Sequence, residues 1–377
     1  MKVTMMAKEY PPYVYGGAGV HLRYLSQELS KIIDVEVRCF GDQKSDEKSL
    51  KVRGYKGWDA LKGKKFSPTL ETLSVNMLSQ MEEINSDVVH THTWYGHFGG
   101  LMTKILYDIP FVATCHSLEP LRPWKEDQLG HGYQLSSWIE KIGIESADKV
   151  IAVSNLMKQD ILKFFNIPSE KIEVIHNGVD LNKWKYTPLS DSLKKKYKIA
   201  DDYILFVGRP TPQKGLEYLV DAADKIPVQI VLGATGADTK DYENRMIKEV
   251  EKKKNIVWIH ELLKEEEYVQ LYSSAKIFVC PSIYEPFGII NLEAMATKTP
   301  VIASATGGIL EVVLPEKTGL LVEPKNSEQI AAAVNRLLKD EKLRKTMGIE
   351  GRKRVEEFFS WTYIAQKTKK LYESLVK

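Results

Sequence analysis

The stretch Ile277-Phe-Val-Cys-Pro-Ser-Ile-Tyr-Glu-Pro-Phe-Gly-Ile-Ile-Asn-Leu-Glu293 contains a short apolar run followed by two glutamates, Glu285 and Glu293, eight positions apart. The run ending at Cys280 is typical of a buried strand, Pro-Phe-Gly of a turn, and the residues that follow of a helix start. Open α/β sheets form ligand crevices at such strand ends, where helix N-termini offer free N–H groups to anions. The stretch therefore predicts an α/β fold, with Glu285 on a crevice loop and Glu293 on the next helix, where its carboxylate can accept hydrogen bonds from hydroxyls.

The same alternation of strand and helix patterns runs through the first half of the chain. Helical spacing of apolar residues is found at 20–33, 70–84, 98–107, 137–147 and 155–165, and the strands between them are expected at 3–6, 35–40, 88–91, 111–115, 150–153 and 172–175. This order predicts a parallel sheet with crossover helices.

A lysine-rich interval over 182–203 interrupts the alternation and is interpreted as a linker with a surface helix. Strands then resume at 204–207, 229–232, 256–259, 277–280, 301–303 and 319–322, with helices such as 215–226 and 242–252. The chain is expected to be helical from Ser327 to its end, with breaks at Gly348, Gly351 and Ser360-Trp361.

We therefore predict two Rossmann-like domains that face a central cleft. The first spans 1–185 and takes back the C-terminal helix 361–377, although the pattern itself does not reveal that crossover; the second spans 186–360. A length of 377 residues makes two domains the default.

Composition narrows the class of protein. Apolar residues make up 43%, charged residues 27%, and the net charge is +3, so neither nucleic acid nor an anionic membrane is required as a partner. Cys39, Cys115 and Cys280 have no metal-type or redox spacing, and buried reduced thiols are expected. With no secretory signal and no transmembrane segment, we expect a cytoplasmic protein; its oligomeric state is not predicted.

Two glycine turns follow predicted strands. Gly16 and Gly17 open the first helix, and Thr306-Gly307-Gly308 follows the strand at 301–303. Adjacent glycines let the backbone approach a bulky anion, although the first turn is equally compatible with an ordinary tight turn. A third glycine of the G-x-G-x-x-G fingerprint is missing, which disfavours a nicotinamide cofactor.

Arg209 and Lys214 lie on a loop between a strand and a helix start. Both cations could reach a pyrophosphate there, and the alternative is that they are solvated surface charges. The spacing does not fit the Walker A pattern. Together with the glycine turns, the two cations predict a site for a diphosphate-linked ligand.

Histidines His90, His92 and His97 invite a metal interpretation because alternate strand positions share one face. The chain offers no convincing further ligands and no Asp-x-Asp triplet, so we expect polar crevice histidines, no metal and no cofactor. The segment 111–125 ends a strand in polar and aromatic residues, including His116 and Trp124. With His131 it is interpreted as a wall beside a sugar; a purely structural loop is the alternative.

Taken in order, these motifs resemble the retaining glycosyltransferases of the two-domain GT-B fold, family four, across essentially the whole chain. The resemblance is carried by the Glu285 and Glu293 pair, the Arg209 and Lys214 loop, Asn177-Gly-Val-Asp180 and Thr306-Gly-Gly308. Within that family, the chain resembles the actinobacterial-type glycogen synthases. This narrower resemblance is carried by Glu9-Tyr-Pro-Pro, Tyr-Gly-Gly-Ala-Gly-Val-His21, His92-Thr-Trp-Tyr95 and His116-Ser-Leu-Glu-Pro-Leu-Arg-Pro-Trp-Lys125. That subgroup includes enzymes that extend α-1,4-glucan and enzymes that make α-maltose 1-phosphate.

The resemblance implies roles for individual residues. Arg209 and Lys214 would bind the donor diphosphate, Glu293 the ribose and Glu285 the donor glucose hydroxyls, while His116 would lie beside that glucose. The implied catalytic set is Arg209, Lys214, Glu285 and His116, and the implied substrate-binding set is Glu293, Gly16, Gly17, His131, Phe287, Gly288, Thr306, Gly307 and Gly308. The chain has Val14-Tyr-Gly-Gly17 in place of the Lys-Thr-Gly-Gly turn of the larger bacterial glycogen synthases, so the cation of that turn is absent.

The predicted activity is metal-independent transfer of α-glucose, with retention, from a nucleotide diphosphate glucose. ADP-glucose is favoured as the donor over UDP-glucose, and the acceptor is either α-1,4-glucan or glucose 1-phosphate. The alternatives are a nucleotide-sugar 2-epimerase of similar plan and a non-catalytic glycan- or nucleotide-binding protein.

Overall fold

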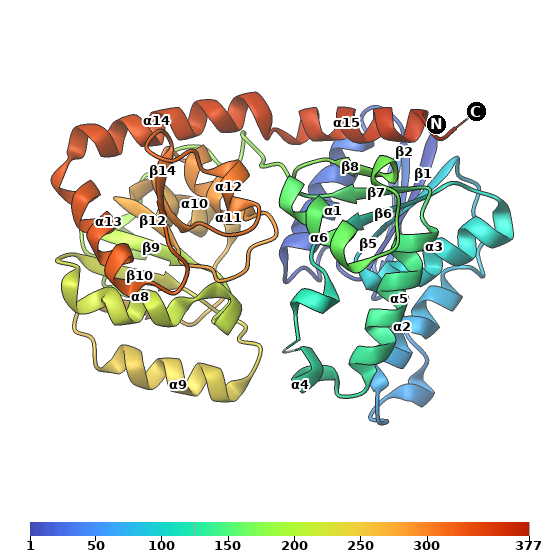
Figure 1. Cartoon of the computed structure of the whole chain (residues 1–377), viewed down its shortest axis with the longest axis horizontal. Coiled ribbons are helices and arrows are strands. Elements are labelled where there is room, and N and C mark those ends of the chain that lie inside the picture. Colours follow the sequence, from blue (N-terminus) through green and yellow to red (C-terminus); the bar gives the residue numbers. More distant parts are fainter. Residues whose placement is uncertain (124, 377) are drawn as a thin grey trace. The chain divides into compact units, whose positions relative to one another are not determined.

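The computed structural model describes residues 1–123 and 125–376, which divide into two compact units. Unit 1 comprises Met1–Asn177 and the C-terminal segment from Trp361, and unit 2 comprises Gly178–Ser360. Each unit has a parallel sheet covered by helices (Figure 1). The predicted α/β class with two Rossmann-like domains is confirmed.

The described part of unit 1 contains an eight-stranded sheet in the order β3-β4-β2-β1-β5-β6-β7-β8. Its strands pair in parallel except for β3, which is antiparallel to β4. The strands are β1 (Lys2–Ala7), β2 (Asp34–Phe40), β3 (Lys44–Asp46), β4 (Leu50–Tyr55), β5 (Val88–His92), β6 (Phe111–Cys115), β7 (Lys149–Ala152) and β8 (Ile172–Val174). The helices are α1 (Gly17–Leu29), α2 (Ser67–Leu78), α3 (Trp94–Tyr107), α4 (Lys125–Leu129), α5 (Gly132–Ser146), α6 (Asn155–Phe164) and α15 (Trp361–Glu373).

Helix α15 belongs to unit 1 because its apolar face completes that unit's core. Trp361, Ile364 and Tyr372 are buried in one hydrophobic cluster with Leu22 and Leu25 of α1. The Tyr372 hydroxyl also hydrogen bonds Nδ1 of His90 at 2.6 Å. The last helix in the sequence is therefore part of the first structural unit, in red beside the blue segments of Figure 1.

The described part of unit 2 contains a six-stranded parallel sheet in the order β11-β10-β9-β12-β13-β14. The strands are β9 (Tyr203–Val207), β10 (Gln229–Gly233), β11 (Ile256–Ile259), β12 (Ile277–Cys280), β13 (Val301–Ser304) and β14 (Gly319–Val322). The helices are α7 (Asp191–Tyr197), α8 (Leu216–Ala222), α9 (Lys240–Glu251), α10 (Glu265–Ser274), α11 (Ile289–Ala296), α12 (Ile309–Val312), α13 (Ser327–Lys339) and α14 (Glu341–Phe358). The apolar runs that predicted the central strands β12 and β13 are buried on both faces, as parallel sheets require, whereas the edge strand β11 is only partly buried.

The junction between the units lies slightly earlier than the sequence pattern suggests. Residues 178–185, assigned above to the first domain, belong to unit 2. Val179 donates its N–H to the carbonyl of Phe359, and the buried Trp184 packs edge-on against Tyr272 with ring centroids 5.4 Å apart.

The expected breaks at Gly348 and Gly351 are wrong, because α14 continues through both. A Cβ atom at Gly348 would lie 2.1 Å from the carbonyl oxygen of Lys298, and one at Gly351 would lie 3.2 Å from Cγ of Met295. The glycines thus permit close packing of α14 on α11 and the residues after it. The expected break at Ser360-Trp361 is confirmed, since α15 starts there.

Cys39, Cys115 and Cys280 are free and buried, as expected. Among the residues that the structure describes, no helix has the length and apolar character needed to span a membrane.

Candidate active site

The carboxyl ends of β9, β12 and β13 meet at one edge of the unit 2 sheet, and the predicted donor residues lie on the loops that leave them. Lys214 follows β9, Glu285 follows β12, and Thr306 to Gly308 follow β13. The loops are joined by backbone contacts, since Ile283 donates its N–H to the Gln213 carbonyl at 2.9 Å. Residues far apart in sequence are therefore held together by the sheet order.

Lys214 and Glu285 form an ion pair, with Nζ 2.6 Å from Oε2. The side chains are only 18% and 9% exposed, and Oε2 also accepts a hydrogen bond from Ser282 at 3.3 Å. A pair this sheltered is strongly oriented, because either charge alone would be left poorly solvated. The ammonium retains other N–H donors that can bind an anion.

Arg209 is held by a carboxylate that the sequence analysis did not single out. Its Nη1 donates to Oδ1 of Asp238 at 2.5 Å, and the arginine side chain remains 34% exposed. Asp238 follows the end of β10, the strand next to β9, which was the available signal. The aspartate fixes the guanidinium at the sheet edge while leaving part of its fork accessible.

The Gly307-Gly308 turn is built around Glu285. Gly308 donates its N–H to the Glu285 carbonyl at 2.9 Å, and the Thr306 hydroxyl donates to the carbonyl of Ile283 at 3.0 Å. Gly307 has φ +55°, and a Cβ atom there would lie 1.9 Å from the Glu285 carbonyl oxygen. The N–H of Gly308, a member of the implied substrate-binding set, is thus already engaged, and the turn positions the Glu285 loop.

Glu293 lies on α11, after Gly288, which has φ +92° at the start of that helix. Although part of the residue is exposed, desolvation of the carboxyl group raises the pKa of Glu293 to about 8, and the nearby Glu265 adds to this. The carboxyl group is therefore largely protonated at neutral pH. Phe287 is buried and packs edge-on against Phe359, so its side chain supports the loop from inside.

In unit 1, the turn before α1 is occupied by a protein carboxylate. The N–H groups of Tyr15 and Gly16 donate to Oε2 of Glu9 at 2.9 and 2.8 Å. Gly16 is the N-cap of α1 and Gly17 its first residue. The anion-binding geometry expected at this turn is present, but Glu9 takes up the N–H of Gly16.

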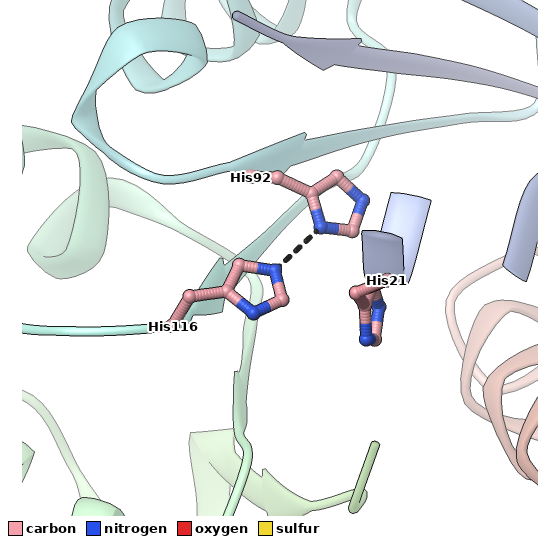
Figure 2. Close-up of side chains that lie close together, drawn as sticks. All are labelled: His21, His92 and His116. Carbon is pink, nitrogen blue, oxygen red and sulfur yellow. Dashed lines mark hydrogen bonds between the residues drawn. The ribbon is translucent and has the colours of Figure 1, made fainter. Parts of the chain in front are cut away.

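His116, His92 and His21 form a cluster at the carboxyl edge of the unit 1 sheet (Figure 2). Nδ1 of His92 lies 3.1 Å from Nε2 of His116, and the ring of His21 lies 4.6 Å from that of His116 between centroids. Nδ1 of His21 hydrogen bonds Oδ1 of Asn177 at 2.6 Å. Within the described chain, Nε2 of His21 and Nε2 of His92 are buried without a hydrogen-bond partner.

Burial keeps this histidine cluster neutral. It lowers the pKa of His21 to about 4 and lowers the pKa values of His92 and His116 well below the usual value. Neutral imidazoles can donate or accept a hydrogen bond with a sugar hydroxyl, and they can also bind a transition metal. One ring nitrogen of each residue lies within 4.8 Å of the others, so these three could hold a metal ion.

Of the three histidines considered for a metal in the sequence, His92 belongs to that cluster, whereas His90 and His97 do not. Nε2 of His90 hydrogen bonds the Thr114 hydroxyl, and Nδ1 of His97 hydrogen bonds the Thr91 hydroxyl, each inside the core. The prediction of polar crevice residues therefore fails for His90 and His97. His21 was missed because it comes from α1, far from the other two in sequence.

Two comparisons with known families and proteins decide the class. Residues 190–354 match the family described as Glycosyl transferases group 1, and residues 15–183 match Glycosyltransferase Family 4. The chain is 40% identical to α-maltose-1-phosphate synthase of Mycolicibacterium smegmatis over 100% of both sequences. This protein belongs to the family 4 glycosyltransferases.

Other similarities of this glycosyltransferase are weaker. Glycogen synthase of Mycobacterium tuberculosis is 27% identical over 99% of this chain and 94% of its own. Among solved structures, sucrose-phosphate synthase from Thermosynechococcus elongatus has a TM-score of 0.83 at 24% identity, covering 99% of this chain and 98% of its own. The catalytic domain of Arabidopsis thaliana starch synthase IV, bound to ADP and acarbose, has a TM-score of 0.75 at 18% identity, covering 100% and 99%. These structures support the fold, and the predicted glycosyltransferase family is confirmed.

The structure describes only part of the wall that was predicted beside the sugar, the segment 111–125 with His131. His131, the residue before α5, is exposed. Within the described chain, its ring makes no contact with the rings of His21, His92 and His116. Trp124 lies outside the described residues. Glu119, in the same segment, is buried and accepts a hydrogen bond from the Ser136 hydroxyl at 3.0 Å, so part of this wall has a structural role.

Proposed function

We propose that this glycosyltransferase moves a glucosyl unit from a nucleotide diphosphate glucose to glucose 1-phosphate, forming α-maltose 1-phosphate with retention and without a metal. The observation that carries the proposal is the 40% identity, over both full lengths, to α-maltose-1-phosphate synthase. Extension of an α-1,4-glucan is the second candidate, supported by the 27% identity to glycogen synthase. ADP-glucose is the favoured donor and UDP-glucose the alternative, and free buried thiols fit a cytoplasmic setting.

The donor diphosphate is proposed to bind at the unit 2 sheet edge. Lys214 and Arg209 are both cations fixed by a carboxylate, so their positions are set before the ligand arrives. Negative charge grows on the departing diphosphate as the bond to glucose breaks, and prepositioned cations stabilise that charge more in the transition state than in the ground state. Electrostatic stabilisation of the leaving group is thus their proposed catalytic role.

Glu285 and Glu293 are proposed to bind donor hydroxyls. The carboxylate of Glu285, already paired with Lys214, can accept a hydrogen bond from the glucose, which links sugar position to diphosphate position. Glu293 is proposed to hold the ribose. His116 of unit 1 completes the proposed catalytic set, as a neutral hydrogen-bonding group for the transferred glucose.

The proposed reaction breaks the bond between C1 of the donor glucose and the β-phosphate oxygen. It forms a bond between C1 and the 4-hydroxyl oxygen of the acceptor glucose, and the hydroxyl proton passes to the departing phosphate oxygen. Because the acceptor enters on the face from which the diphosphate leaves, the configuration at C1 is retained and no protein nucleophile is needed.

Product analysis tests this function. Purified protein is incubated with ADP-glucose or UDP-glucose, each with glucose 1-phosphate, with glycogen and without acceptor, and products are identified by proton and phosphorus NMR. We expect maltose 1-phosphate in the α configuration together with stoichiometric nucleoside diphosphate. Acceptor-independent release of nucleotide with an altered sugar would instead indicate a 2-epimerase, and binding without turnover would indicate a non-catalytic protein.

A further inference from the structure

Lys8 is the first residue after β1, at the carboxyl edge of the unit 1 sheet. Its Nζ lies 4.3 Å from the ring centroid of Tyr95, in the first turn of α3, and 5.6 Å from that of Tyr15. Cation–π contacts of this length hold an ammonium in place without neutralising it. Tyr15 is 58% exposed and Lys8 is itself partly exposed.

Among the residues that the structure describes, no carboxylate lies within ion-pair distance of the Lys8 ammonium. Within the described residues, its ammonium makes no hydrogen bond and no ion pair, whereas the other sheltered cations of unit 1 do: Arg38 pairs with Glu36, Lys104 with Asp148, and Arg122 lies 3.8 Å from Glu119. Burial lowers the pKa of Lys8, against the opposing effect of Glu9 and Glu71. A half-buried cation without a partner is unfavourable, and a bound anion would relieve that cost.

Glu9, the neighbouring carboxylate, is directed elsewhere. Its Oε2 accepts the N–H groups of Tyr15 and Gly16, which fixes it beneath the turn before α1. The partner suited to Lys8 is therefore a group that arrives from solution. A phosphate suits an ammonium well, as an anion with several oxygen acceptors.

The position of Lys8 relates this charge to the proposed reaction centre. β1 pairs with β5, which ends at His92, and β5 pairs with β6, after which His116 follows. Two strand spacings, about 10 Å, separate the ends of β1 and β6. That interval is suited to a hexose phosphate whose sugar points toward His116 and whose phosphate points toward Lys8.

We propose that Lys8, held by Tyr95 and Tyr15, binds the phosphate of the acceptor and so selects glucose 1-phosphate over an uncharged glucan. The proposal rests on the proposed function, because it assigns the acceptor's anionic group to a particular side chain. Lys8 is a positioning and specificity residue in this scheme, since its ammonium touches the phosphate and not the reacting carbon.

The test compares Lys8→Met and Lys8→Arg with the unchanged protein and with Lys141→Met, which removes an exposed lysine on α5. Initial rates are measured against glucose 1-phosphate, against maltotriose as an uncharged acceptor, and against donor alone. We expect Lys8→Met to raise KM for glucose 1-phosphate on the order of tenfold to a hundredfold, the loss of one charge-assisted hydrogen bond. Lys8→Arg should recover most of that loss, and Lys141→Met should match the unchanged protein.

The KM for the donor, the rate of donor hydrolysis and the rate with maltotriose should stay the same in Lys8→Met, which also reports that the variant is folded. An unchanged KM for glucose 1-phosphate, or an equal loss with maltotriose, would overturn the Lys8 assignment while leaving the proposed function intact. Failure of the unchanged protein to use glucose 1-phosphate would overturn both.

Discussion

Replacing Gly307 by alanine should misplace the catalytic loop without unfolding unit 2. The new Cβ would lie 1.9 Å from the carbonyl oxygen of Glu285, whereas real Cβ atoms essentially never come within 3.0 Å of another heavy atom. The loop that carries Glu285 must therefore shift by about 1 Å or more. Displacements of about 1 Å commonly cost on the order of a hundredfold in rate. A left-handed φ adds about 1–2 kcal/mol of backbone strain for alanine.

The assay is the initial rate of glucosyl transfer by purified Gly307→Ala, with thermal unfolding measured in parallel. Gly63→Ala is the matched control, because Gly63 also has positive φ, +68°, but a Cβ atom there would have no neighbouring atom within 4 Å. We expect about a hundredfold loss in kcat for Gly307→Ala and less than a twofold change for Gly63→Ala, with comparable strain in both. A rate near that of the unchanged protein in Gly307→Ala would refute the role of this turn, as would an equal loss in the control.

Three further predictions concern the ion pair, the buried carboxyl group and metal ions. Lys214→Met should reduce kcat at least about a hundredfold, and it should lower the free energy of unfolding by about 3 kcal/mol because Glu285 is left unpaired. The double variant that adds Glu285→Gln should recover the stability, measured by urea titration, but not the activity. If stability stays low in the double variant, the ion pair does not explain the loss. The pKa of Glu293 is raised to about 8, so between about pH 4.5 and 8 the folded protein keeps a proton on this residue that the unfolded chain releases. The contribution of Glu293 to the free energy of unfolding therefore falls as pH rises through that range. Relative to Glu293→Gln, the unchanged protein should lose about 4 kcal/mol of stability across that range, and parallel pH profiles would contradict the shift. Prolonged dialysis against EDTA should leave the transfer rate unchanged, whereas a loss that Zn²⁺ restores would show that the histidine cluster His21, His92 and His116 holds a required metal.

The sheet architecture follows from sequence because parallel strands buried on both faces are nearly continuous apolar runs. The central strands, such as β1 and β12, were located to within a residue or two. Strands β3 and β4 were missed. β3 is an edge strand of the unit 1 sheet and β4 is the strand paired with it, and both include charged residues such as Lys44, Lys51 and Arg53. An edge strand needs only half of its side chains buried, so its apolar signal is weak.

The positions of glycines in the sequence predicted turns correctly in some places and helix breaks wrongly in others. Gly307 and Gly288 adopt positive φ at turns, as their surroundings suggested, whereas Gly348 and Gly351 lie inside α14. Gly348 and Gly351 lie where a Cβ atom would contact Lys298 or Met295 of a neighbouring segment, so they serve helix packing and not helix termination. Such tertiary contacts leave no local mark in the sequence.

Individual site residues were easier to find than their partners. Lys214 and Glu285 were each predicted from their places after strands, but their ion pair joins positions 71 apart and depends on β9 and β12 being adjacent. Asp238, which binds Arg209, follows a third strand. His21 joins His116 only because α1 packs beside the ends of β5 and β6. Strand order, which determines all three contacts, has to be known before they can be inferred.

A crystal structure with bound nucleotide diphosphate glucose tests the central claim most directly, namely that the unit 2 sheet edge holds the donor diphosphate. The predicted result places phosphate oxygens about 2.7–3.2 Å from the guanidinium of Arg209 and the ammonium of Lys214. Density for the diphosphate at a position remote from both side chains would contradict it.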